Sequence, residues 1–125
     1  MWTVSRNLEA PADAVWHVLT DLEAWPRWGP TVSRAELDGA AFELGATGRV
    51  WTPVGVPLPF VLSEVRQGRT WAWQVAGVPA TRHGVEPREG GGSTVWMSAP
   101  LWAPAYLAVL AVALKRIEKL ALQRA

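Results

Sequence analysis

The chain has 125 residues, with 12 Lys and Arg against 11 Asp and Glu and a formal net charge of +1. Because 50% of its residues are hydrophobic, neither an intrinsically disordered chain nor a polyanion-binding surface is indicated. The lack of cysteine excludes a disulfide framework and cysteine metal sites. We therefore expect one domain over residues 1–125, with no nucleic-acid partner, no metal and no cofactor.

The segments that bear on location are the amino terminus and the longest apolar stretch. The first six residues, MWTVSR, lack the apolar core of a secretory signal, so a cytoplasmic protein is the expectation. Residues 101–114 are apolar but contain Pro104, and the stretch is shorter than the roughly 20 residues that span a bilayer. We interpret it as part of a core helix, without stable membrane insertion. A monomer and a homodimer both remain open.

A strand-like run opens the chain, and two short helix signals follow it within residues 10–30. Pro11 suits the first helical position, where its missing N–H would have no partner. Thr20 and Glu23 have the spacing of a capping box, so a second helix is predicted to start there. We expect Pro26 to end that helix, because a proline disfavours the α region for the residue before it.

Alternating and β-branched runs, separated by turn signals, predict further strands. Short connections between them favour antiparallel neighbours, because parallel strands need a long crossover. The predicted strands cover residues 32–37, 48–52, 58–65, 70–75, 81–86 and 94–98.

The register can be predicted for the hairpin around residues 67–68. A two-residue turn there would place Glu64 opposite Trp71, Leu62 opposite Trp73 and Phe60 opposite Val75. Because residues directly opposite one another share a sheet face, one apolar face is expected to carry Phe60, Leu62, Trp71, Trp73 and Val75. On the following strand, His83 and Val85 share one side by the period of two, so we place both toward the core.

The last segment, residues 101–124, predicts a long helix. Its apolar residues recur three and four positions apart and form a core stripe of Tyr106, Leu110, Ala113, Ile117 and Leu120. Cationic residues gather in its last turns, where the helix dipole favours them. The class is therefore α+β: one strand, two small helices, six strands and a long helix that covers the apolar face of the sheet.

Several motifs appear in a recognisable order. Residues 10–21 read APADAVWHVLTD, WGP follows at 28–30, RTWAW stands at 69–73, and GST at 92–94 precedes a strand with Trp96. In this order they resemble the START-like, helix-grip family, also described as SRPBCC or polyketide cyclase-like. The resemblance covers essentially the whole chain. It implies a curved antiparallel sheet of about seven strands, wrapped on the long C-terminal helix, with an internal cavity for an apolar ligand.

Nine tryptophans in 125 residues indicate either a filled core or an aromatic-lined pocket. For the set as a whole we favour the pocket, because ligand sites are mostly apolar with a few polar groups. We expect Trp71, Trp73 and Trp96 to face the last helix. The predicted ligand-binding residues are Trp28, Phe60, Leu62, Trp71, Trp73, His83, Val85, Trp96, Tyr106 and Leu110.

Polar candidates for catalysis are few. His83 is either an ordinary core histidine, a group that orients a ligand carbonyl, or a general base. Tyr106 is expected to use its hydroxyl in a structural hydrogen bond or a ligand contact. These two are the candidate catalytic residues, and Arg49 or Arg82 could assist them.

The apolar, proline-punctuated loop at residues 52–59 is expected to border the cavity mouth, with Trp25 and Trp28 completing a gate. The family includes lipid carriers, hormone receptors and aromatase/cyclases, so its fold does not select a function. We expect a domain that binds a small hydrophobic molecule, aromatic or lipid-like. The alternatives are an aromatase/cyclase- or dehydratase-type enzyme, and a co-chaperone-like protein-interaction module.

Overall fold

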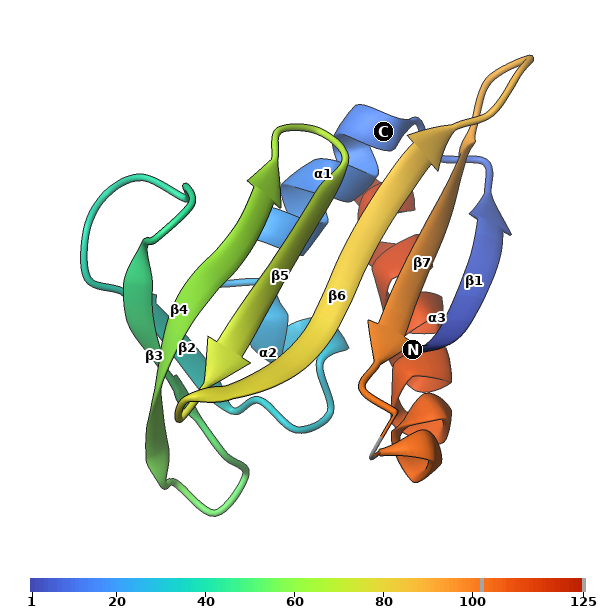
Figure 1. Ribbon diagram of the computed structural model, residues 1–125. Helices are drawn as coiled ribbons and strands as arrows, with labels where there is room; N and C mark the ends of the chain where they lie inside the picture. Colours follow the sequence, from blue (N-terminus) through green and yellow to red (C-terminus); the bar gives the residue numbers. More distant parts are fainter. Residues whose placement is uncertain (102, 125) are drawn as a thin grey trace.

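The alternating segments form one antiparallel sheet of seven strands, in the order β1-β7-β6-β5-β4-β3-β2 (Figure 1). This computed structural model describes residues 1–101 and 103–124. The expected α+β class and the helix-grip arrangement are confirmed. The strands are β1 (Trp2–Leu8), β2 (Arg34–Leu37), β3 (Thr47–Trp51), β4 (Pro57–Arg66), β5 (Thr70–Val75), β6 (Val78–Pro87) and β7 (Ser93–Ala99).

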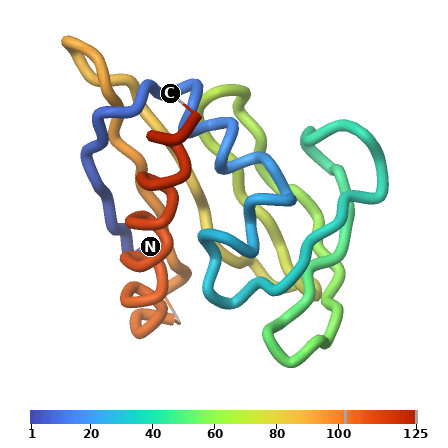
Figure 2. The backbone as a smooth tube through the Cα atoms, turned by 180° about the vertical axis from the view of Figure 1, so that it is seen from behind, coloured from blue at the N-terminus to red at the C-terminus, as the bar shows by residue number. Residues whose placement is uncertain are grey.

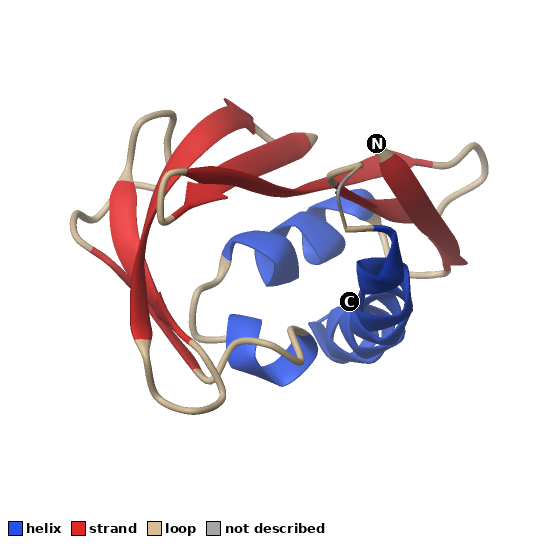
Figure 3. Cartoon of the chain, turned by 60° about the horizontal axis from the view of Figure 1, so that its bottom comes forward, coloured by secondary structure: helices blue, strands red, loops and turns tan. Residues whose placement is uncertain are grey.

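The sheet curves, and the helices lie on its concave side (Figure 3). In the described part of the chain they are α1 (Ala12–Thr20), α2 (Trp25–Trp28), the 3-10 turn η1 (Pro104–Tyr106) and α3 (Leu107–Arg124). The last helix was expected from residue 101, and position 102 lies outside the described residues. It begins at Leu107 because Pro104 starts a separate tight turn.

The second helix starts later than the capping-box spacing predicted. The hydroxyl of Thr20 donates to the carbonyl oxygen of Trp16, four residues back, at 2.9 Å. The carboxylate of Asp21 instead accepts the backbone N–H of Glu23, at 3.1 Å. Pro26 lies in the first turn of α2, where a proline is tolerated, so the expectation that it ends this helix was wrong.

The β4–β5 hairpin confirms two of the three predicted pairs, including Phe60 opposite Val75. Leu62 lies opposite Trp73, as predicted, but Glu64 lies opposite Ala72 rather than Trp71. A bulge after Leu62 and a three-residue turn between Arg66 and Thr70 account for the change. These two departures compensate one another, so the tryptophans of β5 still point to the concave side.

Three helices cover the apolar face of the sheet, whereas the sequence predicts this role for the last helix alone. α3 packs mainly on β1, β7, α1 and α2, while α1 lies against β6 and β7. Figure 2 shows α3 beside the first and last strands, with α1 and α2 across the middle of the sheet. Four of the five residues of the predicted stripe are confirmed, because the buried residues of α3 are Leu110, Ala113, Leu114, Ile117, Leu120 and Ala121. The fifth, Tyr106, lies in η1 and is half-buried.

Trp96 lies on the outer face of the sheet, which corrects the expectation that it faces the last helix. Its neighbours on β7, Val95 and Met97, are fully buried, at 0% exposure. The Trp96 ring covers Gly84, where a Cβ atom would come within 2.2 Å of ring carbon Cε2. The guanidinium of Arg82 lies 5.3 Å from the ring centroid, a cation–π arrangement typical of a solvated face.

Gly48 of β3 is a point of close approach inside the sheet. A Cβ atom at this position would lie 2.2 Å from the backbone oxygen of Glu36 and 2.5 Å from the ring of Phe60. We expect Gly48→Ala to lower the free energy of unfolding by about 1–3 kcal/mol, the usual cost of overpacking. Urea denaturation measures the change.

Gly39 supplies the matched control, because a Cβ atom there would meet nothing within 4 Å. Gly39→Ala should change stability by less than about 0.5 kcal/mol. Equal stability of the two variants would contradict the close packing of Phe60 on β3.

Candidate functional site

The concave side of the sheet holds a stack of three aromatic rings. Trp71 of β5 and Trp25 of α2 lie parallel, with ring centroids 5.0 Å apart and an interplanar angle of 5°. On the other side of Trp71, the His83 ring of β6 stacks with a centroid distance of 3.8 Å. Trp71 and His83 are direct partners in the β5–β6 register, so the sheet itself sets this contact.

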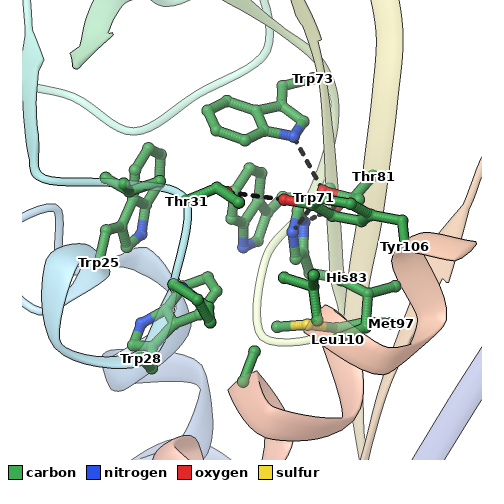
Figure 4. A pocket seen from close by; sticks show the side chains of 15 residues that line it. Trp25, Trp28, Thr31, Trp71, Trp73, Thr81, His83, Met97, Tyr106 and Leu110 are labelled. Carbon is green, nitrogen blue, oxygen red and sulfur yellow. Dashed lines mark hydrogen bonds between the residues drawn. The ribbon is translucent and has the colours of Figure 1, made fainter. Parts of the chain in front are cut away.

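A chain of hydrogen bonds holds His83. Its Nδ1 lies 3.3 Å from the carbonyl oxygen of Trp71, a group that can only accept, so Nδ1 carries the proton. The Nε2 atom then accepts from the hydroxyl of Thr81, at 2.9 Å. That hydroxyl oxygen in turn accepts the indole N–H of Trp73, at 3.0 Å (Figure 4). Both ring nitrogens of His83 are therefore engaged in the neutral state.

Burial determines the charge of His83. The residue is 2% exposed, and desolvation of the charged form lowers its pKa from 6.5 to about 3. The hydrogen bond to the Trp71 carbonyl opposes this shift only in part. At neutral pH the imidazole is thus an uncharged, hydrogen-bonded part of the wall and a poor proton acceptor.

An inner pocket of about 40 Å³ lies beside this stack. Figure 4 shows its walls, with α2 on one side, β5 and β6 on another, and the start of α3 closing it. Its lining residues are Trp25, Trp28, Gly29, Pro30, Thr31, Val32, Trp71, Trp73, Thr81, His83, Met97, Tyr106, Val109, Leu110 and Ala113.

A larger outer pocket, of about 360 Å³, adjoins the inner one. The two share five residues: Thr31, Val32, Trp73, Thr81 and Tyr106. At this junction the hydroxyls of Thr31 and Tyr106 are hydrogen-bonded at 2.7 Å, which ties the loop after α2 to η1. The remaining residues of the outer pocket are Val50, Thr52, Leu58, Val75, Ala80, Pro100 and Ala103.

The structure brings most of the predicted ligand-binding residues to this site. Six of them line the inner pocket: Trp28, Trp71, Trp73, His83, Tyr106 and Leu110. Three others are buried in the core and border neither pocket: Phe60, Leu62 and Val85. Phe60 packs on Gly48 and on Trp25. Trp96, on the outer face, is not part of the site.

Other predicted features are placed differently. Arg82 pairs with Glu64 at 2.9 Å on the outer face, and Arg49 lies 3.8 Å from Glu36, so neither arginine borders the inner or outer pocket. Trp25 is buried at the inner end rather than at a mouth. The loop at 52–59 does border the outer pocket, through Thr52 and Leu58.

Several lining residues were missed, among them Thr31, Thr81 and Met97. Thr81 shares a strand face with His83, and this alternation was a usable signal. Met97 would have followed from the same rule had Trp96 been assigned to the outer face. Thr31 lies in a loop, where no periodicity marks the direction of a side chain.

Within the described residues, no helix is both long and apolar enough to cross a membrane. Over the same part of the chain, no three His, Asp or Glu side chains gather in a way that could hold a metal ion.

Comparison with known proteins agrees with this architecture. The sequence profile of the family described as polyketide cyclase/dehydrase and lipid transport matches residues 2–124. No curated protein sequence matches significantly.

Solved structures of similar fold come from several bacteria. A protein from Nitrosomonas europaea is 20% identical with a TM-score of 0.69, over 98% of this chain and 94% of that one. XoxI from Bacillus cereus is 16% identical with a TM-score of 0.71, over 98% and 96%. A Mesorhizobium loti protein is 15% identical with a TM-score of 0.72, over 98% and 96%. At these identities the likeness concerns the fold alone.

The buried, neutral state of His83 makes stability depend on pH. Because the folded pKa is about 3 and the ordinary value 6.5, the unfolded chain binds one more proton between these values. The free energy of unfolding therefore falls as the pH drops below about 6.5. From pH 7 to pH 5 we expect His83 to account for a loss of about 2 kcal/mol, which His83→Gln should abolish.

Urea denaturation of the wild type and the variant at both pH values measures this difference. The two proteins differ only at position 83. The contributions of all other titratable groups therefore cancel when the pH dependence of the unfolding free energy is compared between them. A variant with the same pH dependence as the wild type would show that His83 is not held neutral in the folded protein.

Proposed function

The chain belongs to the polyketide cyclase/dehydrase and lipid transport family, and on this premise we propose that it binds a small hydrophobic molecule in the inner and outer pockets. The observation that carries the proposal is that two apolar pockets adjoin one another and have five lining residues in common. Among the described residues that line either pocket, none has a side chain charged at neutral pH. Such a lining favours an apolar ligand, because an unpaired charge is costly to bury.

The dimensions support the same proposal. The outer pocket, at about 360 Å³, falls in the range of roughly 300–1,000 Å³ that small-molecule sites occupy. The inner pocket is too small for a whole ligand, at about 40 Å³. A ligand would therefore place its body in the outer pocket and one end in the inner pocket. Aromatic and lipid-like molecules both suit this shape.

The Thr31–Tyr106 hydrogen bond joins two residues that line both pockets. Thr31 is exposed and Tyr106 half-buried, so this bond is accessible to solvent and can open at modest cost. We infer that this hydrogen bond acts as a latch, which closes the passage between the two pockets while it is formed and must break before a ligand can pass. A ligand that reaches the inner pocket passes these two hydroxyls.

A cyclase- or dehydrase-type enzyme is the second candidate, because the family description names these activities. Such a reaction needs a group that exchanges protons near neutral pH. His83 has a pKa of about 3 and both nitrogens engaged, which makes it unsuited to this task. Binding without turnover is therefore the function that the site supports better.

Filling the outer pocket should remove ligand binding. Ala80 of β6 lines this pocket, so Ala80→Phe should weaken binding of the neutral probe N-phenyl-1-naphthylamine at least tenfold. For the wild type we expect a dissociation constant of about 1 μM, or roughly −8 kcal/mol. Fluorescence titration of the probe measures both values.

Ala111 is the matched control, because it is exposed on α3 and outside both pockets. Ala111→Phe should leave the dissociation constant unchanged. The proposal fails if the wild type gives no saturable response to the probe, or if both variants bind it equally well.

Loss of the latch should change rates more than affinity. Tyr106→Phe removes one neutral hydrogen bond, so we expect association and dissociation of the same probe to accelerate by about 2- to 10-fold each. Stopped-flow fluorescence measures the two rate constants. Thr31→Val removes the same bond from the other side and should have the same effect, whereas unchanged rates in both variants would contradict the latch.

A further inference from the structure

Trp71 has a polar atom without a partner in the middle of the site. The residue is fully buried, at 0% exposure. Among the described residues, none accepts a hydrogen bond from its indole Nε1–H. A buried donor left unpaired loses its hydrogen bonds to water and gains none in return, so each such group calls for an explanation.

The other indoles of the site show how unusual this is. The N–H of Trp25 donates to the carbonyl oxygen of Leu19 at 2.9 Å. That of Trp28 donates to the carbonyl oxygen of Val18 at 3.2 Å. The N–H of Trp73 is bonded to the Thr81 hydroxyl. Of the four tryptophans that line the inner pocket, only Trp71 has an N–H without an acceptor among the described residues.

The direction of this N–H follows from the stack. Trp25 and His83 cover the two faces of the Trp71 ring, so only the edge of the indole can reach open space. Trp71 lines the inner pocket, and Figure 4 shows its nitrogen directed toward the space between Trp28 and Leu110. The pocket volume of about 40 Å³ exceeds the roughly 10–15 Å³ that one water-sized group requires.

The surroundings define the chemistry of the group that fits. It must accept a hydrogen bond, because the Trp71 indole is a donor only. It should be neutral, because no described residue of either pocket offers a cation to an anion, and His83 is uncharged at neutral pH. A carbonyl oxygen on an apolar body meets both requirements.

We propose that the inner pocket binds the neutral hydrogen-bond acceptor of a hydrophobic ligand, a carbonyl oxygen being the fitting group, through Nε1–H of Trp71. This inference rests on the proposed binding function and specifies the ligand class. The apolar body lies in the outer pocket, and the acceptor passes the Thr31–Tyr106 junction to reach the indole edge.

A matched pair of ligands tests the proposal. 2-Acetylnaphthalene and 2-isopropenylnaphthalene have nearly the same shape, but the first has a C=O group where the second has C=CH₂. Isothermal titration calorimetry should give about 3- to 10-fold tighter binding for the ketone, the gain expected from one neutral hydrogen bond. The carboxylate 2-naphthoate should bind at least tenfold more weakly than the ketone, because its charge has no partner.

Two variants assign the preference to one indole. Trp71→Phe should abolish the preference for the ketone over the alkene. Trp28→Phe removes an indole N–H from the same pocket, but one that is already bonded to Val18, so the preference should persist even if both affinities fall.

A spectroscopic readout does not depend on the folding of either variant. In ¹H–¹⁵N spectra of the wild type, the Trp71 indole proton, assigned through bonds, should shift downfield with the ketone and not with the alkene. Equal affinities for ketone and alkene, or a Trp71 signal that responds identically to both, would overturn this inference alone. Binding of neither compound would overturn the proposed function as well, and tightest binding of the carboxylate would overturn the neutral ligand class.

Discussion

The parallel contact between Trp25 and Trp71, continued by His83, determines how the interior is built. Trp25 comes from the short helix α2, and the other two rings come from adjacent strands. Stacked aromatic pairs stabilise a fold beyond the area that they bury. This stack therefore fixes the distance of α2 from the sheet, and the space left between α2, η1 and the start of α3 becomes the inner pocket.

The same stack sets the polarity of that space. It buries His83 deeply enough to keep the imidazole neutral, and it leaves only one edge of Trp71 free to contact a ligand. Most polar atoms around the pocket satisfy one another, as in the Trp73–Thr81–His83 chain. We infer that such a site selects its ligand mainly through shape and apolar contact, with one directional hydrogen bond from Trp71 to orient it.

Much of the fold could be predicted, because alternation with a period of two survives in β4, β5 and β6. Local exceptions escaped prediction: the bulge after Leu62 leaves no mark in the residue pattern, and Trp96 is hydrophobic yet lies outside, over Gly84 and beside Arg82. For the site, period-two alternation placed His83 and Trp71 correctly. The partners of their polar atoms depend on tertiary distances, so neither the neutral His83 nor the unpaired Trp71 N–H could be derived from spacing.

The pairing of β1 with β7 has a consequence for how the molecule is made. The hydroxyl of Thr94 on β7 donates a hydrogen bond to the side chain of Asn7 on β1, 87 positions earlier in the sequence. The helix α3, which packs on both strands, follows β7 in the chain. Contacts between residues so distant form slowly, because the loop that joins them must first be closed. During synthesis, β1 therefore emerges long before its partner strand and its helical cover. The hairpins from β3 to β6 can form earlier, but the inner pocket is completed only when Met97 of β7, Tyr106 of η1 and Leu110 of α3 have joined them.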